Sequence, residues 1–192
     1  MPKHFGTRSG RNIAKWPPTP TELTTSTPAD RLPHAWDTSL RWWTHCRTQP
    51  WFAGVANPLS LRPLSKGERV VDVGSGAGFD CFVAAHHVGS FGHVVGVDMT
   101  EEMLSKARQT ATSIGFDHVE FKAGLAEDLP IASGWADVVI SNGVINLCAD
   151  KRMVFREIHR VLRPGGHLEF ADIANGRPVP EAAVQKVDLW TA

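Results

Sequence analysis

The chain has 192 residues, of which 42% are hydrophobic and 21% charged, and its twenty Lys and Arg residues balance twenty Asp and Glu residues. This size and composition predict one globular domain with an extension. The neutral charge argues against a dedicated nucleic-acid binder. No apolar run approaches the roughly 18 residues that a membrane span needs, and no signal-peptide hydrophobic region is present. The scattered cysteines at positions 46, 81 and 148 form neither a disulfide framework nor a CxxC metal motif, so we expect a reducing, cytoplasmic location.

Residues 1–35 are rich in proline, threonine and serine. Such a composition offers little apolar burial to offset chain entropy, so we expect a disordered arm. Residues 36–63 are rich in tryptophan, and Trp36, Leu40 and Trp43 share one face of a predicted helix. This segment is expected to pack on the domain that follows or to act as a lid over a binding cleft.

Strands and helices alternate from residue 64 to 173, which predicts an α/β fold with a parallel sheet covered by helices on both faces. Gly115 is expected to end the second helix, which Thr100 begins as its cap, and Asp150 to cap the third. Pro164-Gly165-Gly166 is expected to stop that third helix. The predicted strands are Val70–Val73, Val94–Val97, Val119–Lys122, Ala136–Ser141 and His167–Ile173, and the first predicted helix is Phe79–His87.

A glycine loop follows the first predicted strand, with Gly74, Gly76 and Gly78 in a G-x-G-x-G pattern. Glycines allow a tight turn and close approach of a ligand, and helix N-terminal amides favour an anionic group. The residue after Gly78 is Phe79 rather than the third glycine of a dinucleotide fingerprint, and Asp72 would repel a pyrophosphate. These features favour a smaller, cation-bearing nucleoside, although the glycines would also suit a plain strand-to-helix turn.

Asp98 ends the second predicted strand, where an acid can accept hydrogen bonds from both ribose hydroxyls. Together with the glycine loop, with Ala126-Glu127-Asp128-Leu129-Pro130, with the fourth-strand run ending at Asn142 and with Leu162-Arg163-Pro164-Gly165-Gly166, this acid makes the chain resemble the class I S-adenosylmethionine (SAM)-dependent methyltransferases. The resemblance implies a Rossmann-like, doubly wound, mostly parallel sheet and SAM as cofactor. It also implies a set of cofactor-binding residues, namely Asp72, Gly74, Ser75, Gly76, Gly78, Asp98, Met99, Ala126, Glu127 and Asn142.

A narrower resemblance joins the segments 74–81, 97–100 and 141–147 to arsenite methyltransferases. That chemistry needs thiolates, because arsenic(III) is soft and thiophilic. The family's cysteines would fall near Val55 or Ala56, at Gly143, and beyond Leu189-Trp190-Thr191, where this chain has none. The sequence therefore predicts that arsenite methylation is lost, unless Cys81 and Cys148 replace those thiols.

Residues 174–192 are expected to form a loop and one helix, with no room for the last two strands of the class I fold. The sequence thus predicts a truncated sheet of about five strands whose open edge invites self-association.

The favoured function is methyl transfer from SAM to an unidentified small molecule. Asn142 and Asp172 are the candidates for catalysis, and no metal site is predicted. The alternatives are a non-catalytic, vestigial SAM-binding protein and an arsenite methyltransferase that uses Cys81 and Cys148; no nucleic-acid or membrane partner is expected.

Overall fold

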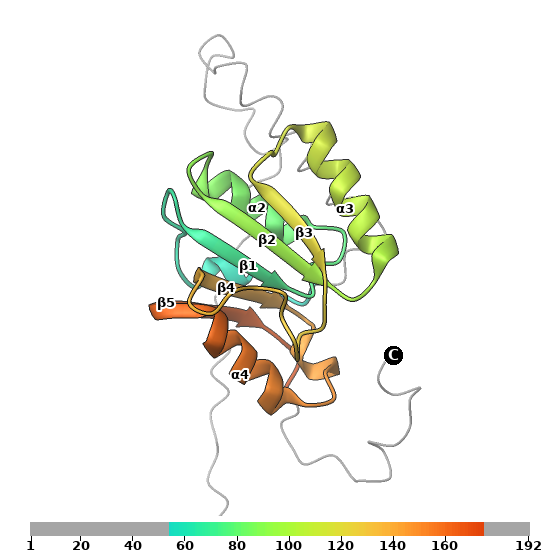
Figure 1. The fold of residues 1–192 in the computed structure, drawn as a ribbon, viewed down its shortest axis with the longest axis vertical. Helices are drawn as coiled ribbons and strands as arrows, with labels where there is room; N and C mark the ends of the chain where they lie inside the picture. Colours follow the sequence, from blue (N-terminus) through green and yellow to red (C-terminus); the bar gives the residue numbers. More distant parts are fainter. Residues whose placement is uncertain (1–53, 175–192) are drawn as a thin grey trace, which may run out of the picture. The chain divides into compact units, whose positions relative to one another are not determined.

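The computed structural model describes residues 54–174. These residues form one five-stranded, fully parallel sheet in the order β3-β2-β1-β4-β5 (Figure 1). The strands are β1 (Arg69–Val73), β2 (His93–Asp98), β3 (Val119–Ala123), β4 (Ala136–Asn142) and β5 (Leu162–Ala171). The helices are α2 (Phe79–Val88), α3 (Glu101–Ile114) and α4 (Lys151–Val161), with short 3-10 turns η2 (Pro58–Ser60) and η3 (Ile145–Leu147). The predicted α/β class and five-stranded sheet are confirmed.

Successive strand residues point to opposite faces of the sheet, and the buried apolar residues divide accordingly. Val70 in β1 and Val94 in β2 pack with residues of α2 and α3 on one face. Val71 in β1 and Val95 in β2 pack with residues of α4 on the other. Both faces of the sheet are therefore covered, as the continuous apolar strands predicted.

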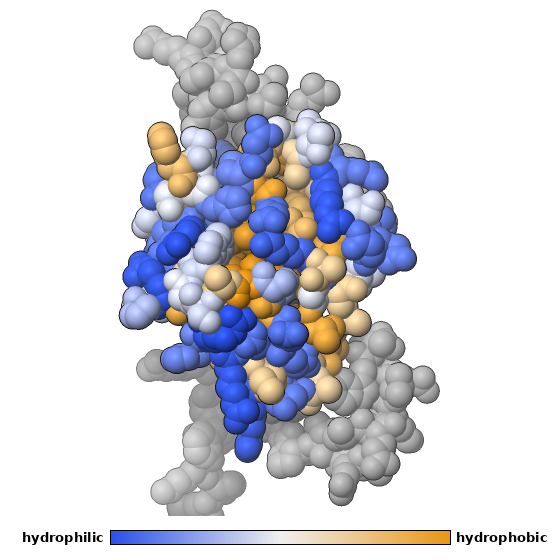
Figure 2. Space-filling view, viewed as in Figure 1, coloured by the Kyte–Doolittle hydropathy of each residue, from blue (hydrophilic) through white to orange (hydrophobic). Residues whose placement is uncertain are grey.

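Hydrophobic residues also reach the surface across the middle of the face shown in Figure 2, between the α3 side and the α4 side. Several large apolar side chains are exposed in the segments that follow strand ends, among them Met99 after β2, Leu125 after β3, Leu147 in η3 after β4, and Ile173 after β5. All four follow carboxyl ends of parallel strands, which lie at one edge of the sheet. That edge therefore combines apolar side chains with the turns that leave the strands.

The structure corrects both bounds of the fifth predicted strand. The strand β5 begins at Leu162, immediately after α4, and ends at Ala171, whereas the sequence predicted a strand from His167 to Ile173. Its register against β4 shifts between the pairs Ala136–Leu162 and Val138–His167, so Pro164-Gly165-Gly166 forms an irregularity within the strand. The segment Pro164-Gly165-Gly166, which was expected to stop the helix, therefore forms a bulge in β5. The bulge adds residues that do not pair with β4.

The helix caps follow the sequence in part. Asp150 caps α4, since its side chain accepts a hydrogen bond from the Met153 amide, and Gly115 ends α3 with a left-handed backbone. Thr100 occupies the cap position of α3, but its side chain makes no capping hydrogen bond. Its amide instead donates to Asp98 Oδ1 at 2.9 Å.

The predicted arm at residues 1–35 lies outside the described residues. So do the tryptophan-rich helix and all but the first residue of the 174–192 segment. Within residues 54–174, none of the helices has the length and hydropathy of a membrane span.

Candidate cofactor site at the carboxyl edge of the sheet

The glycine loop leaves β1 at Val73 and enters α2 at Phe79. Gly74, Gly76 and Gly78 all have positive φ angles, of 75°, 52° and 88°. The amides of Gly74 and Ser75 donate to the Val97 carbonyl at 2.8 and 3.0 Å, which ties the loop to the end of β2. Residues that carry a Cβ rarely adopt this backbone, so the three glycines permit the turn.

Two of these glycines differ in what surrounds them. A Cβ on Gly74 would lie 2.3 Å from a methyl carbon of Val144, so the loop packs there against the segment after β4. A Cβ on Gly76 would meet nothing within 4 Å. The backbone at Gly76 is therefore open to a ligand, while Gly74 serves packing.

Asp98 stands at the end of β2, beside the open part of the loop. Its Oδ2 accepts the Gly76 amide at 2.8 Å, and its Oδ1 accepts the Thr100 amide. The carboxylate expected to bind ribose is thus oriented by two backbone donors from different loops. Met99, the next predicted site residue, is 76% exposed.

Asp72, one residue before the end of β1, is only 2% exposed. Its Oδ2 accepts a hydrogen bond from Cys81 Sγ at 3.2 Å. Burial, and then the nearby charge of Asp80, raise the pKa of Asp72 well above its ordinary value. Cys81 belongs to α2 and is fully buried, and this burial raises the pKa of its thiol. Cys81 is therefore a protonated donor and not an exposed nucleophile.

Asp80 belongs to this site although it was not among the predicted site residues. It lies in the first turn of α2, is 7% exposed, and accepts a hydrogen bond from Asn142 Nδ2 at 2.9 Å. Burial raises its pKa to about 6. An acid directly after a glycine loop was the available sequence signal, but only the fold shows that it is buried.

Among residues 54–174, no lysine or arginine contributes to the shifted pKa values of Asp72 and Asp80. Two neighbouring buried carboxyl groups without a cation are costly, because each disfavours ionisation of the other. The Oγ of Ser75, also buried, has no hydrogen-bond partner among the described residues. The site is thus electrostatically suited to a cationic ligand.

Asn142 ends β4 and contacts the chain through every polar atom of its side chain. Oδ1 accepts the amides of Val55 and Ala56 at 2.8 and 3.2 Å, and Nδ2 donates to the Ala56 carbonyl at 2.7 Å and to Asp80. The remaining predicted residues also follow strand ends, since Ala126 and Glu127 lie in the loop after β3. The structure thus brings all the predicted residues to the carboxyl edge of the sheet.

Asp172, the second candidate for catalysis, follows β5 directly. Its Oδ2 accepts the Asn146 amide at 2.9 Å and its Oδ1 accepts the Ile173 amide at 2.7 Å. Cys148 follows η3, is partly buried, and its Sγ donates to the Val144 carbonyl at 3.5 Å. Burial, followed by the charge of Glu127, raises its pKa. Residues 54–174 contain no group of three potential metal ligands.

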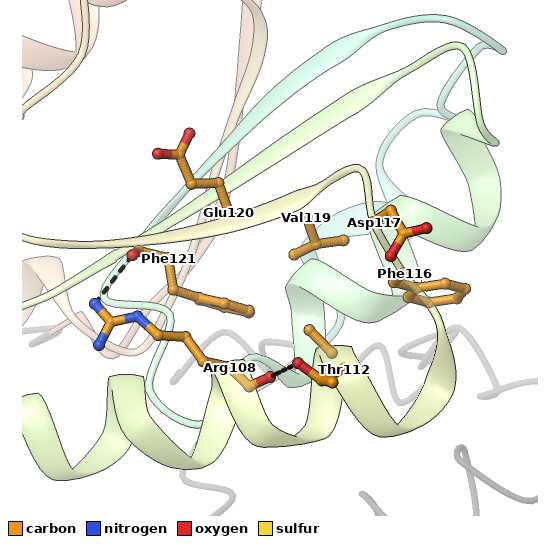
Figure 3. Close-up of a pocket in the computed structure, with 8 residues that line it drawn as sticks. Arg108, Thr112, Phe116, Asp117, Val119, Glu120 and Phe121 are labelled. Carbon is orange, nitrogen blue, oxygen red and sulfur yellow. Dashed lines mark hydrogen bonds between the residues drawn. The ribbon is translucent and has the colours of Figure 1, made fainter.

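A separate hollow of about 300 Å³ lies between α3 and β3 (Figure 3). Arg108 spans it and donates to the Phe121 carbonyl at 3.1 Å, while the Thr112 hydroxyl donates to the Arg108 carbonyl at 3.0 Å. Most of its lining comes from the end of α3 and the start of β3. None of the predicted site residues lines it, so we place the candidate site at the glycine loop and not in this hollow.

Comparison with known proteins decides the family. A family model described as a methyltransferase domain matches residues 64–191, which is more than half of the chain. The chain belongs to this methyltransferase-domain family. The predicted resemblance to class I methyltransferases is thereby confirmed.

The curated relatives include arsenite and demethylmenaquinone methyltransferases. This chain is 48% identical to an arsenite methyltransferase of Halobacterium salinarum over 138 residues. The match covers 72% of this chain and 35% of the relative. It is 36% identical over 115 residues to a demethylmenaquinone methyltransferase of Listeria monocytogenes, which cover 59% of this chain and 48% of that protein. The chain therefore spans about a third to a half of the length of these curated relatives.

The solved structures agree with the sequence relatives. The crystal structure of an arsenic(III) S-adenosylmethionine methyltransferase from Chlamydomonas reinhardtii superposes with a TM-score of 0.68 at 36% identity. The match covers 74% of this chain and 52% of that one. A SAM-dependent methyltransferase from Aquifex aeolicus, at 24% identity and a TM-score of 0.59, shares the fold.

Proposed function

We propose that the carboxyl edge of this sheet binds S-adenosylmethionine and that the protein transfers its methyl group to a small-molecule acceptor. The observation that carries the proposal is the open backbone at Gly76 beside the oriented carboxylate of Asp98. Family membership supports it independently.

Each part of the cofactor would meet a matching part of the edge. Asp98 would accept the ribose hydroxyls, because a strand-end carboxylate in a doubly wound sheet suits that role. The loop from Gly74 to Gly78 would accommodate the methionine portion. The exposed apolar side chains of Met99 and Leu125, together with the partly buried Ala126, would pack against the adenine ring.

Charge complementarity supports a sulfonium nucleoside in particular. When bound, SAM supplies a methyl group already activated by its positively charged sulfur. Asp80, buried beside the loop with a pKa of about 6, would supply negative charge above that pH, and no lysine or arginine among the described residues acts on the pKa of Asp72 or Asp80. The residues of this chain would then act mainly by holding and aligning the reactants, because the sulfonium is already activated.

Asn142 and Asp172 remain the candidates on the acceptor side of the site. Asn142 is the last residue of β4, and Asp172 directly follows β5. A non-catalytic SAM-binding protein is the alternative that shares the same cofactor site.

Arsenite is the second candidate acceptor, and the 48% identity to an arsenite methyltransferase is the observation that favours it. The described thiols oppose it. Cys81 is buried and bonded to Asp72, and burial raises the pKa of Cys148, whereas arsenic(III) requires thiolates. Cys46 lies outside the described residues.

Calorimetry tests the cofactor claim first. Titration of the full chain with SAM and with S-adenosylhomocysteine should give one site per chain at micromolar affinity, and failure to bind either compound would reject the proposal. Methyl release is then measured with thiol, hydroxyl, amine and quinol acceptors. Turnover of any acceptor separates the enzyme from the non-catalytic alternative.

Arsenite binding is followed in the same preparation by tryptophan fluorescence. We expect weak binding that Cys148→Ser does not change. Tight binding that Cys148→Ser abolishes would favour the arsenite acceptor instead.

A cytoplasmic location and self-association through the outer edge of β5 stay predictions. Sedimentation experiments can test the self-association.

A further inference from the structure

The side chain of Asn142 has no hydrogen-bonding capacity left for a ligand. A carboxamide has two N–H donors and one oxygen with two lone pairs. Here Oδ1 receives two backbone amides, and Nδ2 donates once to a backbone carbonyl and once to the Asp80 carboxylate. The partners also fix the orientation of the amide, since a flipped side chain would set donors against donors.

Three of these four bonds go to Val55 and Ala56, which lie 87 and 86 positions earlier in the chain. Both residues are exposed, so their side chains provide little burial to hold them in place. The bonds to Asn142 are the described polar contacts that attach this short segment to the end of β4.

The next part of the chain is held by different contacts. Residues 54–68, which we call the strap, run from the carboxyl edge of β4 to the start of β1. Arg62 pairs with Glu169 of β5 at 3.1 Å and with Glu68 at 3.0 Å, and Leu59 and Leu64 pack against the buried core. The body of the strap is therefore anchored independently of Asn142, and only its first residues depend on that side chain.

The position of this attachment gives it a functional meaning. It lies between the ends of β1 and β4, where the sheet order changes direction and where ligands bind in doubly wound folds. Asp80 links it to the helix that begins at the glycine loop. A side chain here controls whether the first residues of the strap border the site.

We propose that Asn142 is a positioning residue: together with Asp80 it clamps residues 54–57 against the carboxyl edge, and it does not itself bind the methyl donor. The clamp borders a cofactor site only if the proposed function holds, but the attachment of the strap does not depend on it. Asn142 thereby sets the acceptor-side border of the site through Val55 and Ala56.

Amide hydrogen exchange at Val55 and Ala56 tests the clamp directly, because both amides donate to Asn142. In Asn142→Ala, we expect both amides to exchange at least tenfold faster, while amides of β1 and β2 keep their protection. The matched carboxamide control, Gln109→Ala on the exposed surface of α3, should leave both amides unchanged. Unchanged exchange at Val55 and Ala56 in Asn142→Ala would overturn the proposal.

A swap keeps the test valid if Asn142→Ala fails to fold. Asn142→Asp keeps the acceptor for both amides but sets two carboxylates side by side, so exchange should accelerate. In the double variant Asp80→Asn/Asn142→Asp, the bond between the two side chains is restored with donor and acceptor exchanged, while the Ala56 carbonyl loses its donor, so exchange should be slower than in Asn142→Asp but faster than in the wild type. Exchange as fast as in Asn142→Asp would contradict the Asp80–Asn142 pairing.

The affinity for S-adenosylhomocysteine separates positioning from ligand binding. We expect its Kd to change less than threefold in Asn142→Ala. A loss of tenfold or more, with exchange at Val55 and Ala56 unchanged, would instead make Asn142 a cofactor contact. If the wild type does not bind this nucleoside, the proposed function fails, whereas the exchange experiment still decides the clamp.

Discussion

The amide of Gly76 donates a 2.8 Å hydrogen bond to Asp98 Oδ2, which joins the loop after β1 to the end of β2. The second oxygen of the same carboxylate receives the amide that precedes α3. One side chain therefore connects two loops that both border the proposed cofactor site. A ligand that hydrogen-bonds to Asp98 would act on the geometry of the glycine loop as well.

Asp98→Asn is expected to weaken the binding of S-adenosylhomocysteine by about 10- to 100-fold, because a charge-assisted acceptor for hydroxyls is lost at an oriented position. Isothermal titration calorimetry measures the change. Asp117→Asn, an exposed aspartate before β3, is the matched control and should bind like the wild type. Equal affinities for Asp98→Asn and Asp117→Asn would remove Asp98 from the site.

Gly74→Ala is expected to destabilise the fold by about 2 to 4 kcal/mol, since it combines an unfavourable left-handed backbone with overlap against Val144. Gly76→Ala has the same backbone problem but meets no neighbour, so a cost of about 1 kcal/mol is expected. Chemical denaturation gives both values. Equal costs for the two variants would show that Val144 does not pack against the loop.

The pKa of Asp80, about 6 in the folded chain against an ordinary value of 3.8, predicts a pH dependence of stability. Between these values the folded chain binds more protons than the unfolded chain, so the free energy of unfolding rises as the pH falls through 6. The contribution is complete below pH 3.8 and is lost as the pH rises through 6. A shift of this size corresponds to about 3 kcal/mol.

Asp80→Asn removes this titration, so the variant should be more stable than the wild type at pH 7.5 and lose most of that advantage at pH 4.5. Denaturation at both pH values measures the difference. Asp117→Asn again serves as the control. A variant whose stability follows the wild-type pH profile would mean that Asp80 is not the responsible group.

The outer edge of β5 is unpaired within residues 54–174. Next to it, Phe155 and Phe170 are each 41% exposed and contact each other with ring centroids 6.0 Å apart. An open strand edge beside apolar side chains favours pairing with another chain. We expect concentration-dependent association in sedimentation experiments, reduced by Phe170→Lys but not by Phe91→Lys at the distant α2–β2 turn. A monomer at all concentrations would contradict this expectation.

The core of the fold could be predicted because its signals are local. Short apolar runs predicted the strands, and the glycine loop with Asp98 predicted the edge where site residues meet. The start of β5 was missed because Pro164-Gly165-Gly166 reads as a stop signal, although pairing with β4 extends the strand through it.

The role of Asp80 and the partners of Asn142 could not be predicted in the same way. Their contacts join residues 62 and 86 positions apart, and no local pattern encodes such pairs. Burial of Asp80 also depends on how α2 packs against the sheet. These features follow from tertiary structure alone.

The central claim is that the loop from Gly74 to Gly78 and the carboxylate of Asp98 hold a sulfonium nucleoside. A crystal structure of the full chain grown with S-adenosylhomocysteine tests it most directly. We expect the ribose hydroxyls within hydrogen-bond distance of Asp98 and the amino-acid portion over Gly76. Electron density for the nucleoside at another place, or none at this edge despite binding in solution, would contradict it.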